Sequence, residues 1–388
     1  MMNILFFTQF PIIPSQGGVQ RVTDILAREF QHKGLNVLYM TTFVDADKED
    51  YNSLQYFLPV RDISAKNNVD FLTNFLNDHK IGFVINQAGI YRHIIQFLSN
   101  VISANIGLIT VHHNTVFGLN THYKDIVIAE NRTTLKWKLL NFSLFWDLMR
   151  FRHKIKYGNY LKEAIKASDY MVFLSENFVE ELPLYNVAVS HKTIAINNPT
   201  SFDVQEINFC QKENRICFIG RLTVTQKRVD RLMRILKILH EKLPNYKFDI
   251  CGDGSSHKFV NDFIENNNLY RVVLHGFINP EEVLQKSKFL ILPSDFEGFG
   301  MVLIEAQAFG VIPIAFNCYN GIKEVINHPN AGFVIPDFDE NSLIEKIIEL
   351  TNDTILGENI SKNAKLNVKR FNTSKIADEW ISLFKKIK

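Results

Sequence analysis

The amino-acid sequence predicts an α/β protein made of two doubly wound domains, each built on a parallel sheet. The chain has 388 residues, more than the roughly 100–200 residues of a usual domain. Short β-rich runs alternate with helical segments along its length, and the alternation restarts after a polar, aperiodic segment at 199–213. We therefore expect two such domains that face each other across a cleft, with ligands at the carboxyl ends of the strands.

The first domain is expected over residues 1–200. Its apolar runs, such as Leu108–Val111, lack period-2 alternation, which is typical of parallel strands buried on both faces. An amphipathic helix is predicted at Val19–Lys33. The predicted strands are Asn3–Thr8, Asn36–Thr42, Gly82–Asn86, Gly107–His112, Tyr170–Ser175 and Thr193–Asn197.

The second domain is expected over residues 201–372 and repeats the pattern. Helices are predicted at Lys227–Lys242, Ser255–Asn266 and Met301–Phe309. The predicted strands are Arg215–Gly220, Tyr246–Cys251, Arg271–His275, Phe289–Pro293, Val311–Ala315 and Gly332–Ile335. A last helix, 373–388, carries Ile376, Trp380, Ile381 and Phe384 at helical spacing, so it should pack on a domain surface.

Composition excludes several classes of protein. Lysine and arginine total 43 against 41 acidic residues, a balance that disfavours a broadly basic nucleic-acid binder. The four cysteines are widely spaced, which favours reduced, buried thiols over disulfides or zinc. The N-terminus has no signal-peptide pattern, and no apolar run reaches the about 18 residues of a spanning helix. We expect a cytoplasmic protein that does not cross a membrane.

Segment 136–162 departs from the alternation of strands and helices. Seven cationic residues and one acidic residue are interspersed there with large apolar side chains. Such a basic, aromatic helix suits the anionic inner face of a cell membrane. A long helix between strands, with its aromatic side chains packed into the first domain, explains the same pattern. Periodicity does not separate the two interpretations.

The strongest local signal is Glu297-Gly-Phe-Gly-Met-Val-Leu-Ile-Glu305, directly after a predicted strand. Gly298 and Gly300 permit a turn whose backbone approaches a ligand closely. The following helix start favours an anion. Glu305 lies in an apolar stretch, where a carboxylate requires hydrogen-bond donors such as sugar or ribose hydroxyls or a backbone turn.

Other predicted strand ends carry weaker signals. Arg221 and Lys227 lie on a strand-to-helix loop and suit a diphosphate, although an isolated pair of this kind is more often explained by surface cations on a solvated loop. Gly17 and Gly18 form a turn after the first strand. His112 ends another first-domain strand and is the first of two adjacent histidines. A metal would need a third ligand, and none stands nearby in the sequence. Gly252 begins a Gly-Asp-Gly turn after a second-domain strand.

Taken together, these motifs resemble the retaining glycosyltransferases of family 4. The resemblance rests on Glu-x7-Glu at 297–305, Gly-Arg…Gln-Lys-Arg at 220–228, Gly-Asp-Gly and His-Gly-Phe, in this order across the second domain. The first-domain Gly-Gly loop and Thr-Val-His strand end agree as well. The resemblance implies the GT-B fold of two Rossmann-like domains and a donor of nucleotide-diphosphate-sugar type (UDP or GDP). It also implies no cofactor and no essential metal.

The resemblance also implies roles for individual residues. Arg221 and Lys227 would hold the donor diphosphate, Glu305 the ribose hydroxyls and Glu297 the hexose. Since the family usually has one fewer residue between the arginine and the lysine, loop 222–226 should bulge. The catalytic set would be Glu297, His112, Arg221 and Lys227, and the remaining donor-binding residues Gly17, Gly18, Gly252, His275, Gly276, Phe277, Gly298, Phe299, Gly300 and Glu305.

These features predict a hexosyltransferase that builds a surface polysaccharide or glycolipid, such as lipopolysaccharide or capsule, on a glycan or lipid-linked acceptor. A nucleotide-sugar epimerase and a non-catalytic partner of another transferase remain as alternatives. A phosphorylase would need a cofactor lysine, which the sequence does not indicate. A nicotinamide dehydrogenase is disfavoured because no Gly-x-Gly-x-x-Gly follows the first strand.

Overall fold

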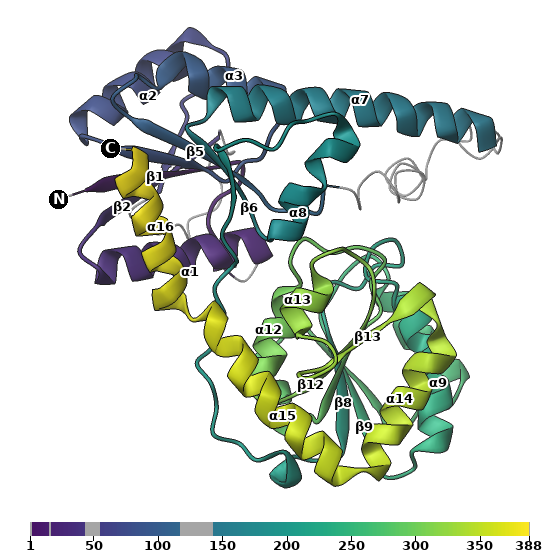
Figure 1. Ribbon diagram of the computed structural model, residues 1–388. Helices are drawn as coiled ribbons and strands as arrows, with labels where there is room; N and C mark the ends of the chain where they lie inside the picture. The colour runs from purple at the N-terminus through teal and green to yellow at the C-terminus, as the bar shows by residue number, and fades with distance from the viewer. Residues whose placement is uncertain (1, 15–16, 43–54, 117–142, 388) are drawn as a thin grey trace. The chain divides into compact units, whose positions relative to one another are not determined.

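The computed structural model describes residues 2–14, 17–42, 55–116 and 143–387. The described chain divides into two compact units, each with its own parallel sheet (Figure 1). The first unit contains the described residues of 2–116 together with 146–201 and 371–387, and the second contains 143–145 and 202–370. The prediction of two doubly wound α/β domains is confirmed.

The first unit is a seven-stranded sheet in the order β3-β2-β1-β4-β5-β6-β7, with every pair parallel. Most residues of its strands are buried, as expected for parallel strands covered by helices on both faces. The strands are β1 Asn3–Thr8, β2 Asn36–Thr41, β3 Gln55–Phe57, β4 Phe83–Asn86, β5 Gly107–His112, β6 Tyr170–Phe173 and β7 Thr193–Ala195. The helices are α1 Gly18–His32, α2 Lys66–Asp78, α3 Arg92–Val101, α7 Ser143–Ala167, α8 Glu176–Glu180 and α16 Thr373–Ile387.

Helix α16 returns the end of the chain to this first unit, where it packs against α1 (Figure 1). The Phe384 ring lies 5.7 Å from Phe30 of α1 and 4.8 Å from Phe83 of β4, measured between centroids. Ile376, Trp380 and Phe384 are buried. The packing of the last helix on a domain surface is therefore confirmed.

The second unit is a six-stranded parallel sheet in the order β10-β9-β8-β11-β12-β13. The strands are β8 Arg215–Ile219, β9 Lys247–Cys251, β10 Val272–Gly276, β11 Phe289–Leu292, β12 Ile312–Phe316 and β13 Phe333–Ile335. The helices are α9 Val229–Lys242, α10 His257–Asn266, α11 Pro280–Lys286, α12 Met301–Ala308, α13 Ile322–Ile326, α14 Glu340–Asn352 and α15 Thr354–Val368.

The predicted elements agree with the observed ones to within two residues at each end. Helix α9 begins at Val229 instead of Lys227, because Arg228 has a left-handed backbone (φ 50°, ψ 50°) that a right-handed helix excludes. The short strand β3 was not predicted. Three of the four cysteines are buried as expected, whereas Cys210 is exposed.

Candidate functional site

The carboxyl edge of the second sheet has a topological switch point between β8 and β11. From β8 the chain continues to β9 and β10 on one side, and β11 leads to β12 and β13 on the other. Loops that leave neighbouring strands in opposite directions open a crevice, which is where doubly wound sheets bind their ligands. The loop after β8 carries Arg221 and Lys227, and the loop after β11 carries Glu297. Two of the predicted motifs therefore meet at this switch point.

Lys227 and Glu297 form an ion pair across these two loops. The Lys227 Nζ atom lies 2.6 Å from Glu297 Oε1, and the two side chains are only 15% and 8% exposed. Partial burial strengthens such a pair because solvent screens it less. The pair presents one cation and one carboxylate at the carboxyl edge, a combination that suits a ligand with both an anionic group and hydroxyls.

The loop that holds Glu297 is fixed by its own backbone and by a tyrosine. Gly300 has φ +75°, a conformation that favours glycine, and it immediately precedes α12. The Tyr319 hydroxyl donates to the Phe299 carbonyl at 2.6 Å, and the Phe299 side chain is buried. The result is a rigid turn from β11 into α12 with Gly298 and Gly300 on either side of Phe299.

Glu305 lies on the second turn of α12 and is 2% exposed. Seven consecutive residues of this helix, Val302–Ala308, are buried, so α12 is a core helix. A carboxylate in such a place has to be satisfied by donors, whether from the protein or from a ligand. Glu305 is therefore placed in the interior, in agreement with the apolar context seen in the sequence.

Arg221 is exposed, and its loop is braced by the Gly-Asp-Gly turn after β9. The Leu222 amide donates to the Asp253 carbonyl at 2.9 Å, and a Cβ atom on Gly252 would lie 1.9 Å from the Gly220 carbonyl oxygen. Gly252 also has φ +138°. The glycine is thus required by the close approach of two loops, and this contact supports the backbone that carries Arg221.

The predicted His275-Gly276-Phe277 segment lies at the end of β10, beside the same turn. The Gly252 amide donates to the Gly276 carbonyl at 2.7 Å, and Gly276 has φ +68°. His275 Nε2 lies 2.7 Å from Asp249 Oδ1, and Asp249 also accepts two bonds from Arg215. The Phe277 side chain is 64% exposed and leaves an aromatic surface at this edge.

The first-unit residues lie at the carboxyl edge of the other sheet. Gly17 has extended backbone and precedes α1, which begins at Gly18. A Cβ atom on Gly18 would meet nothing within 4 Å, so open space surrounds it. His112, at the end of β5, is 4% exposed, and its Nε2 atom lies 2.5 Å from the Tyr157 hydroxyl. Burial lowers the pKa of His112 to about 4, so the imidazole is neutral near pH 7.

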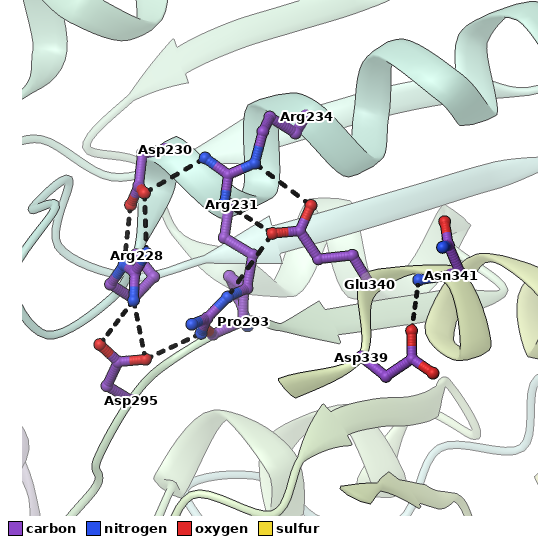
Figure 2. Close-up of polar contacts among 9 residues, drawn as sticks. All are labelled: Arg228, Asp230, Arg231, Arg234, Pro293, Asp295, Asp339, Glu340 and Asn341. Atoms are coloured by element: carbon purple, nitrogen blue, oxygen red, sulfur yellow. Dashed lines mark hydrogen bonds and ion pairs between the residues drawn. The ribbon is translucent and has the colours of Figure 1, made fainter. Parts of the chain in front are cut away.

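Sequence reasoning missed a set of charged residues around the Lys227–Glu297 pair. Asp295 and Arg231 are both buried and bonded to each other, and Arg228 bonds Asp295 as well (Figure 2). Tyr319, which holds the Glu297 loop, was also missed. Asp295 and Arg228 stand inside the motif loops, but their long-range partners are not visible in the sequence.

Within the described residues, no group of three or more histidine, cysteine or acidic side chains is arranged to hold a metal ion. A search of the same residues for membrane-crossing helices found none that combines the necessary length and apolar character. Of the segment 136–162, residues 136–142 lie outside the described chain, and α7 accounts for the rest.

Comparison with known proteins agrees with this geometry. Residues 200–367 match the family described as Glycosyl transferases group 1. Solved structures of the GT-B class cover the whole chain: TarM of S. aureus has TM-score 0.75 at 15% identity (99% of this chain, 100% of that one). Sucrose-phosphate synthase from Thermosynechococcus elongatus has TM-score 0.76 at 17% identity (100% and 99%).

Two curated relatives match part of the chain. An α-1,4-N-acetyl-D-galactosaminyltransferase of Campylobacter jejuni, which acts on a glycan on diphosphoundecaprenol, is 33% identical over 194 residues (49% of this chain, 54% of the relative). A poly(ribitol-phosphate) α-N-acetylglucosaminyltransferase of Staphylococcus aureus is 30% identical over 177 residues (45% and 36%). The chain thus spans about half the length of these relatives or less.

The two doubly wound units and the switch-point loops define a protein of the GT-B class. Residues 200–367, which carry the second-domain motifs, match the group 1 glycosyl transferases (family 4). The resemblance drawn from the motifs is therefore borne out over this segment, and the GT-B fold is confirmed.

Proposed function

We propose that the chain is a retaining glycosyltransferase that transfers a hexose from a UDP- or GDP-type sugar donor. The acceptor is a glycan or lipid-linked glycan of a surface polysaccharide or glycolipid. The observation that carries the proposal is the Lys227–Glu297 pair at the switch point, with Glu305 buried in the helix that follows. Three solved structures of the same fold are complexes with UDP, which supports testing UDP donors first.

Each side chain has a distinct task in this proposal. Lys227 and Arg221 neutralise the donor diphosphate, Lys227 as a fixed cation and Arg221 from the exposed side of the same loop. Glu297 accepts hydrogen bonds from the hexose, and Glu305 from the ribose. His275, Gly276 and Phe277 border the nucleobase, while Gly17 and Gly18 leave room beside the sugar phosphate. The neutral His112 contacts the transferred sugar as a hydrogen-bonding group.

The reaction exchanges one bond for another at the anomeric carbon. The bond to the diphosphate oxygen breaks, the acceptor oxygen bonds to the same face, and the acceptor proton passes to the departing diphosphate. Negative charge grows on the diphosphate as the sugar becomes oxocarbenium-like. Fixed cations and backbone N–H groups at this edge stabilise that charge better in the transition state than in the ground state.

The relatives' names support a role in surface glycans. They include the Campylobacter enzyme above, an amylovoran biosynthesis glycosyltransferase of Erwinia amylovora, and a lipopolysaccharide outer core galactosyltransferase among the solved structures. The Campylobacter enzyme is named for a glycan on diphosphoundecaprenol, and the other two are named for amylovoran and lipopolysaccharide. We infer an acceptor of that kind for this chain.

We further propose that α7 lies on an anionic membrane at the inner face of the cell. Leu148, Phe151 and Ile155 are 48–60% exposed and are spaced so that they share one face of the helix. The same face carries the exposed cations Arg152, Lys156, Lys162 and Lys166. A shallow cavity of about 420 Å³ between α3 and α7 is lined by Arg92, Lys156, Asn159, Tyr160, Lys162 and Glu163. This apolar and cationic face suits lipid phosphate groups.

The proposed activity is tested by incubating the protein with UDP- and GDP-sugars and following nucleotide release. Hydrolysis or transfer with retention of the anomeric configuration, measured by NMR, is the expected result. A sugar converted to its epimer without nucleotide release would indicate the epimerase instead. Nucleotide-sugar binding without any turnover, with or without glycan acceptors, would favour the non-catalytic partner.

A further inference from the structure

Arg228, the residue directly after Lys227, combines an unusual backbone conformation with ion pairs to two aspartates. Its φ of 50° and ψ of 50° place it in the left-handed region, which residues other than glycine seldom occupy. It stands immediately before α9, where the loop from β8 ends. Surrounding contacts must hold such a conformation, and they are found on both edges of its guanidinium.

The Arg228 guanidinium bridges two aspartates (Figure 2). Its NH1 nitrogen donates to both carboxylate oxygens of Asp295, at 3.1 and 2.8 Å. Its Nε and NH2 nitrogens donate to the two oxygens of Asp230, each at 2.9 Å. Hydrogen bonds to these carboxylates, to Asp230 first, raise the pKa of Arg228, so its charge is fixed. Paired contacts of this kind determine orientation as well as distance.

Asp295 is the junction between the two loops of the switch point. Its amide donates to the Gln226 carbonyl at 2.9 Å, and its buried carboxylate accepts from Arg231 at 2.9 Å. Arg231 in turn donates to the Pro293 carbonyl at 2.7 Å, where the loop leaves β11 (Figure 2). Asp295 is therefore held by two arginines of the α9 region and by the backbone next to Lys227.

This arrangement sits one residue from Lys227 and two residues from Glu297. Arg228 and Arg231 both pair with the buried Asp295. Lys227 pairs with Glu297, at 2.6 Å. Arg228 and Asp295 can affect donor binding without contacting the donor, because their contacts hold the β8 and β11 loops in position.

We propose that Arg228 and Asp295 are positioning residues that lock the β8 and β11 loops together and so pre-form the Lys227–Glu297 site. The inference rests on the proposed function, since the site that they position is the proposed donor site. A pre-formed site binds a ligand more tightly because less conformational freedom is lost on binding.

The test compares Arg228→Gly with Arg234→Ala. Glycine accepts the left-handed backbone, so the variant removes the guanidinium without adding strain. Arg234 belongs to the same charged network, through Asp230 and Glu340, but is exposed and lies away from both loops (Figure 2). Hydrogen exchange of residues 220–228 and 293–300 is measured in the ligand-free proteins, together with melting temperature, affinity for UDP and GDP, and KM and kcat for the donor.

Arg228→Gly is expected to speed exchange in both loops and to weaken nucleotide binding by about tenfold. It should raise KM for the donor more than it lowers kcat, and Arg228→Lys should restore part of the affinity. Arg234→Ala should leave loop exchange and affinity unchanged even where it lowers the melting temperature. Unchanged exchange and affinity in Arg228→Gly, or equal losses in Arg234→Ala, would overturn the proposal.

Failure of the proposed function gives a different result. If the parent protein binds no nucleoside diphosphate, the donor site is wrong, while the exchange measurement still reports whether Arg228 locks the loops. If the parent binds and Lys227→Ala loses affinity but Arg228→Gly does not, the donor site stands and only the positioning role is wrong.

Discussion

The Nζ atom of Lys227 lies 2.6 Å from Oε1 of Glu297, which joins the loops that leave β8 and β11. The two residues are 70 positions apart in the sequence, and the switch point of the sheet brings them together. A cation and a carboxylate at this position can divide the recognition of a sugar nucleotide, the lysine toward phosphate and the glutamate toward hydroxyls. The predictions below separate these tasks.

Replacing Glu297 by glutamine should lower turnover, whereas replacing Glu305 by glutamine should lower nucleotide affinity. Glu305→Gln should weaken binding of the bare nucleoside diphosphate, because the ribose loses its charged acceptor. Glu297→Gln should leave that affinity nearly intact and lower turnover, since its contacts to the hexose strengthen as charge develops. Calorimetry and donor turnover measure the two effects. Parallel losses of affinity, turnover and melting temperature in both variants would mean that the glutamates only brace the loop.

The burial of His112 should make stability depend on pH. Its folded pKa is about 4 against 6.5 for the free side chain, so between these values the unfolded chain binds more protons. Stability should therefore rise from pH 4 to 6.5 and fall on acidification. A shift of this size corresponds to about 3 kcal/mol. His113 is half-buried, and desolvation together with the neighbouring His112 lowers its pKa to about 3, so it adds to the same slope.

Chemical denaturation of His112→Gln at several pH values checks this expectation. The difference in unfolding free energy between parent and variant should change through the window from pH 6.5 to 4. His257→Gln, which removes an exposed imidazole of the second unit, is the matched control. A His112→Gln variant with the same pH dependence as the parent would show that the buried imidazole does not titrate in this way.

Gly252→Ala should destabilise the second unit because its Cβ would lie 1.9 Å from the Gly220 carbonyl oxygen. The overlap, together with φ +138°, should cost about 3 kcal/mol and displace the loop that carries Arg221. Gly276→Ala is the control, since φ +68° strains it but no atom lies within 4 Å, for a cost of about 1–2 kcal/mol. Thermal unfolding that ranks the two variants equally would contradict the close approach of the two loops.

The exposed face of α7 should bind vesicles that contain anionic phospholipid and release them as salt rises. Reversing Arg152, Lys156 and Lys162 to glutamate should abolish co-sedimentation. The control reverses three exposed lysines of the second unit, Lys237, Lys247 and Lys258, for the same change in net charge. If both triple variants lose co-sedimentation equally, the binding reflects net charge alone. If neither loses it, the membrane interpretation is wrong and α7 is a helix that packs into the protein.

Periodicity predicted most of the fold because parallel strands buried on both faces stand out as apolar runs. Strand β3, Gln55–Phe57, was not predicted because it has only three residues and begins with a polar one, so it shows no hydrophobic periodicity. The start of α9 was predicted two residues too early, because the residue types of Lys227 and Arg228 do not indicate the left-handed backbone of Arg228. The motifs marked Lys227, Glu297 and Glu305 as candidates, whereas the Arg228–Asp295–Arg231 contacts depend on how two distant loops fold together. The assigned site roles remain predictions.

The most direct test of the account is the affinity of Lys227→Ala for UDP and GDP, measured by calorimetry. Loss of a charge-assisted contact to the diphosphate should cost about 1.5–3 kcal/mol, so affinity should fall at least about tenfold. The double variant Lys227→Ala/Glu297→Gln corrects for the carboxylate left without its cation, and exposed Lys258→Ala is the control. We expect both Lys227 variants to bind at least tenfold more weakly than the parent, while Lys258→Ala binds as the parent does. Equal affinity of parent and Lys227→Ala would contradict a donor site at this pair.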